Sequence, residues 1–424
     1  MSKRENKRDI LVYVHWKGLK DPFLMGTLHS ELLRGKEVFS FDYEEAWLQS
    51  GYAQQLDPDL ELYSGRHYLN DEKPNFGLFL DSSPDRWGRV LMRRREAALA
   101  VKENRPENPL FETDYLLGVY DSHRIGALRF KLEMEGAFLN DNRAMATPPW
   151  TSIRELEEIS LKLEDENSGD DPDYLKWLNM LVAPGSSLGG ARPKASVMDP
   201  DNQLWIAKFP SRNDPADVGG WEMVTYRLAK AAGIHMAESQ ARKFSSRHNT
   251  FLTRRFDRTI TGERIHFASA MTMLGYTVGQ DYQDGVSYLD LVDFIGRKGA
   301  IVEADMEELW RRIVFSICVS NTDDHLRNHG FILTPQGWVL SPAYDINPVE
   351  TGTGLCLNIS ENDNSLSLEL AMEVHGHFRL TEQKALKIMN DVKNSVKSWR
   401  KVAIQMGISK AEQDLKARAF SRAE

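Results

Sequence analysis

The sequence predicts an α+β fold with a β-rich N-terminal part and an all-helical C-terminal lobe. Strand-like segments dominate the first half of the chain, beginning with residues 10–17. A glycine-rich stretch is followed at once by a hairpin pattern. Beyond residue 258 apolar residues recur at helical spacing, interrupted by one hairpin pattern at residues 330–340. The helices expected there span residues 287–296, 305–319, 365–374 and 381–405.

The composition is that of an ordinary globular protein. The 424 residues are 41% hydrophobic and 27% charged, which predicts two or three structural units and argues against disorder. The formal net charge of -9 means that the bulk surface does not attract nucleic acid. The two cysteines, Cys318 and Cys356, form no metal-binding spacing and no disulfide framework. No segment predicts a signal peptide or a membrane span, so we expect a cytoplasmic protein.

We expect three parts along the chain. Residues 1–136 form an N-terminal subdomain in which no catalytic constellation is visible. Residues 137–150 contain Asn and Pro and are typical of a linker. Residues 151–258 form a small-lobe-like region with the glycine-rich loop, and residues 259–424 form the helical lobe.

The stretch from Asn321 to Phe331 carries the clearest chemistry. Asp323 and Asn328 stand five apart, the interval at which a phosphotransfer loop presents a catalytic carboxylate and a metal-binding amide. A second acid, Asp345, follows the hairpin. Phosphoryl transfer needs Mg²⁺ to neutralise the phosphates and a group to orient the attacking hydroxyl, and Mg²⁺ prefers hard oxygen ligands. The pattern therefore predicts a kinase-type active site.

Two other interpretations of this stretch stay open. It could be a polar loop that caps the preceding helix with solvated carboxylates. His325 and His329, four apart, could also bind zinc, although the glutamate of the helical HExxH motif is missing.

Residues 184–194, Pro-Gly-Ser-Ser-Leu-Gly-Gly-Ala-Arg-Pro-Lys, form the second informative stretch. Glycines let backbone N–H groups approach phosphate oxygens, and Arg192 and Lys194 add positive charge. The same letters match the G-x-S-x-G elbow of hydrolases through Gly185, Ser187 and Gly189. An elbow joins a strand to a helix, whereas here a helical segment precedes and a hairpin follows. That context favours phosphate binding over an elbow or an ordinary flexible loop.

Lys208 interrupts an otherwise apolar strand and lies on the same side as Leu204 and Ile206. A buried lysine is costly unless it is paired, so an inward Lys208 predicts an anion, either a nucleotide phosphate or a glutamate. Glu222 begins the next helix and would complete the strand-lysine and helix-glutamate pair of kinases. The alternative is a lysine that reaches solvent from an edge strand. Together with the loop motif, the pair favours a protein-kinase-like two-lobed fold.

Taken in order, these segments resemble the HipA family, the serine/threonine kinase toxins of bacterial toxin–antitoxin modules. The resemblance covers nearly the whole chain and includes an N-terminal subdomain of the type found before the kinase core of that family. The motifs that carry it are Met25-Gly26-Thr27-Leu28, Gly126-Ala127-Leu128-Arg129-Phe130, Gly189-Gly190-Ala191-Arg192-Pro193-Lys194, Arg255-Phe256-Asp257-Arg258, Asn321-Thr322-Asp323-Asp324-His325 and Tyr344-Asp345.

The resemblance implies roles for individual residues. Asp323 matches the catalytic base, and Asn328 and Asp345 match the Mg²⁺ ligands. Ser187, or its neighbour Ser186, matches the loop serine that such kinases autophosphorylate, which ejects the loop and stops ATP binding. The residues expected at the ATP site, with Lys208 on the phosphates and Arg254 and Phe256 at the adenine, are Gly189, Gly190, Ala191, Arg192, Lys194, Lys208, Arg254, Phe256, His325, Asn328 and Asp345.

The resemblance also implies cofactors and partners. We expect ATP and Mg²⁺, a protein substrate in translation such as an aminoacyl-tRNA synthetase, and a small helix-turn-helix antitoxin of the HipB type. DNA would be contacted only through that antitoxin, and no membrane is involved. The sequence departs from the family at Arg327, where lysine is more usual, and at Arg192-Pro193, where some members have Gln-Glu.

Three other functions remain open at this stage. The same chemistry serves a small-molecule kinase, which would not label itself with phosphate. A serine hydrolase would use Ser187 and would react with a fluorophosphonate without ATP. A catalytically inactive binding module would gain no thermal stability from ATP and Mg²⁺.

Overall fold

A computed structural model describes residues 6–70, 72–165, 168–182, 190 and 192–424. The chain forms two compact units, one made of residues 1–207 with 257–268 and the other of residues 208–256 with 269–424. Both contain helices and strands, which confirms the predicted α+β class. The three-part division of the chain stays a prediction. No helix in the described ranges is long and apolar enough to cross a membrane.

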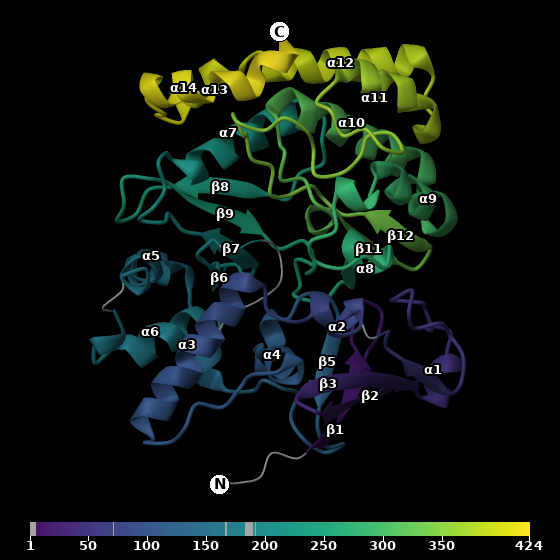
Figure 1. The fold of residues 1–424 in the computed structure, drawn as a ribbon, viewed down its shortest axis with the longest axis vertical. Helices are drawn as coiled ribbons and strands as arrows, with labels where there is room; N and C mark the ends of the chain where they lie inside the picture. Colours follow the sequence, from purple (N-terminus) through teal and green to yellow (C-terminus); the bar gives the residue numbers. More distant parts are fainter. Residues whose placement is uncertain (1–5, 71, 166–167, 183–189, 191) are drawn as a thin grey trace. The chain divides into compact units, whose positions relative to one another are not determined.

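The first unit contains a five-stranded sheet in the order β4-β3-β2-β1-β5, and each neighbouring pair is antiparallel (Figure 1). Gly26 lies where two of these strands come closest. A Cβ atom on Gly26 would lie 2.3 Å from the carbonyl oxygen of Asp42, so only glycine fits there. The strands are β1 (Lys7–Val14), β2 (Phe23–Leu33), β3 (Lys36–Tyr43), β4 (Arg66–Tyr68) and β5 (Leu128–Lys131).

Helices and a second group of strands complete the first unit. The longest helix of this unit is α3, which carries several arginines, and α6 ends just before the glycine-rich stretch. The remaining elements are α1 (Glu45–Leu48), α2 (Gly77–Asp81), α3 (Arg86–Lys102), α4 (Glu112–Gly118), α5 (Ile153–Leu163), α6 (Tyr174–Val182), β6 (Lys194–Met198) and β7 (Leu204–Lys208), which ends on the first residue of the second unit.

A buried ion pair joins β6 to the start of α3 within this unit. The Nζ of Lys194 lies 2.7 Å from Oδ2 of Asp85, and both side chains are almost fully buried. The other oxygen of Asp85 accepts the backbone N–H of Gly88 at 2.8 Å and so caps α3. One carboxylate therefore holds both the helix and the lysine that follows the glycine-rich stretch.

The second unit is mainly helical. Within it, α12 packs against α10 and α7, and α13 packs against α7 (Figure 1). Its elements are α7 (Val218–Ala231), β8 (Ser239–Arg242), β9 (Thr250–Arg254), α8 (Ala270–Met273), α9 (Tyr288–Lys298), α10 (Val302–Val319), β11 (Gly330–Thr334), β12 (Gly337–Leu340), α11 (Leu368–Val374), α12 (Glu382–Val396), α13 (Trp399–Gln405) and α14 (Lys410–Lys416); β10 (Phe267–Ser269) crosses the boundary between the units.

Helix α10 is the buried centre of the second unit. Its apolar residues surround most of its circumference, and the side chains of Leu309, Trp310, Ile313 and Ile317 are fully buried. The indole of Trp310 donates to the carbonyl oxygen of Ala371 at 3.1 Å. The helix is therefore a rigid base for the loop that follows it.

An aromatic cluster explains the one helix whose predicted extent was wrong. The expected helix 381–405 is divided into α12 and α13. The ring of Trp399, the first residue of α13, stacks on Phe420 at 4.5 Å between centroids and lies 6.1 Å from Trp221 of α7. A straight continuation of α12 would carry Trp399 in another direction, so the burial of these rings outweighs helical continuity.

The Asp85–Lys194 pair gives a prediction about stability. Replacing Lys194 by Met leaves Asp85 buried without its cation, so the free energy of unfolding should fall by about 3–5 kcal/mol, measured by urea denaturation. The double variant Asp85→Asn with Lys194→Met should recover most of the loss, because Asn also caps helices and carries no charge. Equal losses in the single and double variants would contradict this account.

Candidate active site

A sharp turn ends α10 and begins the loop that carries Asp323. Ser320 closes the helix in the left-handed conformation, with a φ of 52°, which a non-glycine residue keeps only when its surroundings hold it. Its hydroxyl donates to the carbonyl of Ala419 at 2.8 Å, and the backbone N–H of Asn321 donates to the carbonyl of Ser316 at 2.8 Å. The start of the loop is therefore fixed on the buried helix.

The side chain of Asn328 folds back onto Asp323. A 3₁₀ turn at Leu326–Asn328 lets its Nδ2 donate to the backbone carbonyl of Asp323 at 2.8 Å. Asn328 is buried, and in the described part of the chain its Oδ1 has no hydrogen-bond partner. A buried amide oxygen without a donor costs free energy. Such an oxygen suits a hard cation such as Mg²⁺.

The carboxyl of Asp323 reaches solvent but is partly buried. Partial burial raises its pKa, the neighbouring His325 lowers it, and the carboxylates of Asp345 and Asp324 raise it again; the pKa stays above the ordinary value. A carboxylate with a raised pKa is a stronger proton acceptor.

The adjacent residue, Asp324, points into the protein and anchors the loop. Its Oδ2 accepts the hydroxyl of Tyr288 on α9 at 2.6 Å and the hydroxyl of Ser316 on α10 at 3.3 Å. Its Oδ1 lies 3.0 Å from Nε2 of His329. Burial would raise the pKa of Asp324, but His329 and the hydroxyl of Tyr288 outweigh burial and keep it below the ordinary value. The aspartate is therefore held ionised between two helices.

Lys208 lies buried between two carboxylates of the same unit. Its Nζ lies 2.6 Å from Oε1 of Glu222 on α7 and 2.7 Å from Oδ1 of Asp345. Burial alone would lower the pKa of Lys208, but Asp345 and Glu222 together raise it above the ordinary value. The structure thus contains the predicted Lys208–Glu222 pair and adds Asp345 to it.

Asp345 itself is held in a strained conformation. Its φ of 58° lies in the left-handed region, where strain in a non-glycine residue is characteristic of functional sites. The Nδ2 of Asn347 donates to Oδ1 of Asp345 at 3.1 Å, and the N–H of Asn347 donates to Oδ1 of Asn321 at 3.1 Å. Asn347 therefore links Asp345 to the start of the loop that carries Asp323.

Of the two residues predicted at the adenine, Phe256 lies against Tyr344, the neighbour of Asp345. The ring of Phe256 lies 5.7 Å from that of Tyr344, whose hydroxyl donates to the carbonyl of Arg327 at 2.7 Å. Arg254, at the end of β9, forms an ion pair with Glu238 at 3.0 Å. Arg254 is thus engaged by a carboxylate, and its contact with a nucleotide stays a prediction.

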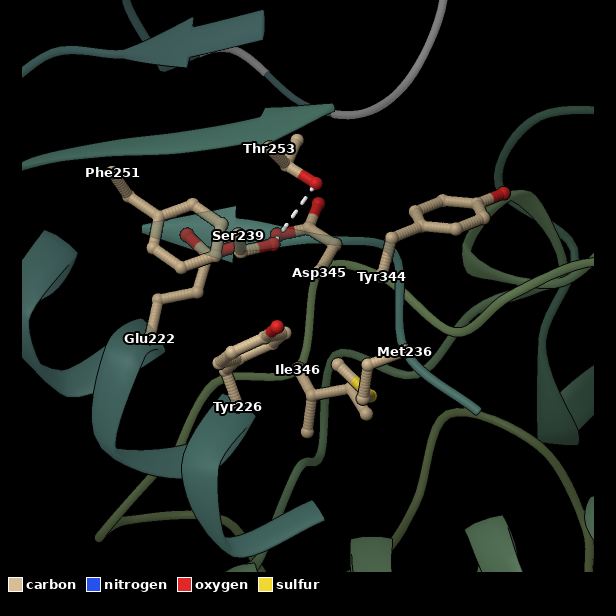
Figure 2. A pocket seen from close by; sticks show the side chains of 9 residues that line it. All are labelled: Glu222, Tyr226, Met236, Ser239, Phe251, Thr253, Tyr344, Asp345 and Ile346. Carbon is tan, nitrogen blue, oxygen red and sulfur yellow. Dashed lines mark hydrogen bonds between the residues drawn. The ribbon is translucent and has the colours of Figure 1, made fainter. Parts of the chain in front are cut away.

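A small cavity of about 10 Å³ lies behind the ion pair, with room for one water (Figure 2). Glu222 and Tyr226 of α7 line one side, and Phe251 and Thr253 of β9 line another. The hydroxyl of Ser239 donates to that of Thr253 at 3.1 Å across the wall. The cavity is too small for a nucleotide, and we interpret it as a packing gap.

The glycine-rich stretch belongs to the first unit and is described only in part. The predicted residues Ser186, Ser187, Gly189 and Ala191 lie outside the described residues. Gly190 has a φ of 64°, a conformation that favours glycine. Arg192 is half-buried, and Lys194 forms the ion pair with Asp85 and donates to the carbonyl of Gly190 at 3.2 Å. The phosphate-binding roles of these residues stay predictions.

The alternatives from the sequence gain no support. Helix α6 comes before the glycine-rich stretch and strand β6 after it, the reverse of the strand-to-helix order of a hydrolase elbow. Of the two histidines considered for zinc, His329 lies against Asp324. Among the described residues, no three His, Cys, Asp or Glu side chains form a group that could hold a metal.

Sequence reasoning missed the residues that position the site. Tyr288, Ser316 and His329 hold Asp324, and Asn347 holds Asp345. Asn347, two residues after Asp345, and His329, five residues after Asp324, lay close in sequence, but His329 was considered only as a zinc ligand. The partners of Asp324 come from α9, α10 and the loop itself, and no short motif connects them.

Three comparisons with known proteins relate these features to a family. The family model described as HipA-like C-terminal domain matches residues 186–400, which is 215 of the 424 residues. A solved structure of the Shewanella oneidensis MR-1 toxin–antitoxin system, HipA with HipB and operator DNA, matches with a TM-score of 0.65. It is 20% identical, and the match covers 98% of this chain and 96% of that one, so it shows a shared fold.

Two curated relatives are similar over shorter segments. The serine/threonine-protein kinase toxin HipA of Shewanella oneidensis MR-1 is 30% identical, covering 30% of this chain and 34% of the relative. A putative kinase of Haemophilus influenzae Rd is 28% identical, covering 38% and 52%. The chain thus spans between a third and about half of the length of these two relatives.

The anchoring of Asp324 gives a prediction about pH. Folding lowers the pKa of Asp324 from 3.8. The ionised carboxylate therefore stabilises the fold above pH 3.8, and this stabilisation is lost as the pH falls through the lower pKa of the folded state. Asp324→Asn should reduce the free energy of unfolding at pH 7 by roughly 1–3 kcal/mol, measured by urea denaturation. The difference from the parent should shrink at low pH. A difference independent of pH would show that the charge is unimportant.

Proposed function

Because the chain belongs to the HipA family, we propose that it is an ATP- and Mg²⁺-dependent protein serine/threonine kinase. The observation that carries this proposal is the grouping, within one unit, of a buried lysine between two carboxylates and a loop that presents Asp323 and Asn328. Kinases use a lysine of this kind on the ATP phosphates and an Asp and Asn at this spacing. Relatives over part of the chain are named as kinases, which also supports it.

The residues present fit the cofactors. When bound, Mg²⁺ neutralises the charge on the phosphates. The Oδ1 of Asn328, buried and lacking a partner among the described residues, and the carboxylate of Asp345 are hard oxygen ligands for it. Lys208 would bind phosphate oxygens from its position between Glu222 and Asp345. Phe256, beside Tyr344, offers an apolar surface to the adenine.

Asp323 would accept the proton of the attacking hydroxyl. Its carboxyl reaches solvent, where a substrate side chain can approach, and its raised pKa makes it a better acceptor than an ordinary aspartate. Its backbone carbonyl is held by Nδ2 of Asn328, so the base and the metal-binding amide are fixed relative to one another. The buried Asp324 holds the loop in place for both.

The biological role follows the family. We propose that the chain is the toxin of a bacterial toxin–antitoxin module, that it acts in the cytoplasm, and that it phosphorylates a component of translation such as an aminoacyl-tRNA synthetase. A similar fold occurs in a HipA structure solved with HipB and operator DNA. A HipB-like helix-turn-helix partner is accordingly proposed, with DNA contacted through that partner, in keeping with the net charge of -9.

Removing the proposed base tests the activity. Asp323→Asn should reduce transfer of the γ-phosphate from labelled ATP by about 10²–10⁴-fold, because Asn cannot accept the proton. A matched control, Asp391→Asn, changes an exposed aspartate on α12 of the same unit and should leave transfer unaffected. Equal rates in the parent and Asp323→Asn would contradict the role of Asp323.

Self-modification separates a protein kinase from a small-molecule kinase. We expect intact-mass measurement after incubation with ATP and Mg²⁺ to show one added phosphate, and peptide mapping to place it on Ser187. Ser187→Ala should abolish the addition, and Ser186→Ala should not. If only Ser186→Ala lost the added phosphate, the modified residue would be Ser186. If the parent gained no phosphate, a small-molecule substrate would be favoured.

A further inference from the structure

We propose that a second cavity, at the start of α7, binds the phosphate group of a small anionic molecule. The cavity has a volume of about 210 Å³, far larger than the gap behind Lys208, and the two share no lining residue. All of its lining residues belong to the second unit. They are Pro215, Asp217, Lys243, Arg247, His248, Gly407, Ile408, Ser409 and Glu412.

Two basic residues in the connection between β8 and β9, Lys243 and Arg247, line this cavity. Lys243 and Arg247 are both exposed, and among the described residues neither has a carboxylate within ion-pair distance. The Nε of Arg247 donates to Nε2 of the buried His248 at 3.0 Å, which fixes the direction of the guanidinium. Within the same described ranges, the two terminal nitrogens of Arg247 have no acceptor. They therefore remain as donors for a ligand.

The two acids in the wall are already engaged by the protein. Oδ1 of Asp217 accepts the backbone N–H groups of Gly220 at 3.0 Å and of Asn249 at 2.8 Å, and its Oδ2 accepts the side-chain amide of Asn249. Oε2 of Glu412 accepts the backbone N–H of Asp217 at 3.1 Å. These hydrogen bonds from neutral groups hold the two carboxylates in place and leave them charged, so an anion would bind through the terminal nitrogens of Arg247 and the ammonium of Lys243.

The chemistry of the free donors favours phosphate. A planar guanidinium forms paired hydrogen bonds with phosphate oxygens, and an ammonium adds a compact charge. A phosphate monoester or pyrophosphate carries enough negative charge for both cations. The volume suits one or two phosphate groups and leaves little space for a large organic part. The rest of the surface, on a chain with a net charge of -9, attracts anions weakly.

The cavity is connected to Lys208 through helix α7. Asp217 caps α7, and a Cβ atom on Gly219 would lie 2.2 Å from the carbonyl oxygen of Asn249, so the first turn of α7 is packed tightly against the β8–β9 connection. Five residues after the cap, Glu222 holds Lys208. A ligand that orders the β8–β9 connection would therefore stabilise α7. An effect of this ligand on ATP binding rests on the proposed function, whereas the binding of the ligand itself does not.

Calorimetric titration with sodium pyrophosphate tests the binding site. At constant ionic strength we expect saturable binding to the parent and at least a tenfold loss of affinity in the double variant Lys243→Ala with Arg247→Ala. A matched double variant, Arg297→Ala with Lys387→Ala, removes the same charges from exposed positions of the same unit and should bind as the parent does. Equal binding by all three proteins, or no binding to the parent, would overturn the proposal.

Competition with ADP and Mg²⁺ distinguishes this site from the proposed nucleotide site. We expect saturating ADP to leave one pyrophosphate site, which is the one sensitive to Lys243 and Arg247. Hydrogen exchange of the first-turn amides of α7 should slow on adding pyrophosphate to the parent and not to the double variant. Displacement of all pyrophosphate by ADP would assign the binding to the nucleotide site and overturn the proposal. If the protein bound pyrophosphate but not ADP, the result would contradict the proposed kinase function and leave the proposed phosphate site standing.

Discussion

The site depends on one buried ammonium group. Lys208 is almost fully buried, and a lysine in such a place is tolerated only when carboxylates surround it. Glu222 and Asp345 do so from two elements that are far apart in sequence, α7 and the segment after β12. Removing either acid would leave an imperfectly balanced charge, so the lysine fixes where α7 and Asp345 can lie. Asn347 then connects Asp345 to Asn321 at the start of the loop that carries Asp323.

Local patterns were enough to predict most of the elements and some of the contacts within the candidate site. Asp323 and Asn328 do lie together, because the 3₁₀ turn at Leu326–Asn328 folds the side chain of Asn328 back onto the carbonyl of Asp323. Lys208 could be recognised because a charged residue interrupted an apolar strand, and Glu222 because it stood near the start of the next helix. In each case the signal lay within about one turn or one strand of the residue concerned.

The supporting contacts could not be predicted because they join distant segments. Asp324 looked like a duplicate of Asp323, yet the structure turns it toward Tyr288, 36 residues earlier. Lys194, expected near phosphate on charge alone, also has a buried partner, Asp85, which lies 109 residues away. The division of 381–405 into α12 and α13 depends on Phe420, which no periodicity within that segment reveals. Packing between segments decides these cases, and one sequence carries no signal for it.

The stacked rings of Trp399 and Phe420 give the last residues described an unexpected importance. Phe420 is 1% exposed, and its ring lies 5.9 Å from that of Trp221, the immediate neighbour of Glu222. Shortening the chain from Ala417 onward would therefore uncover the back of the helix that balances Lys208.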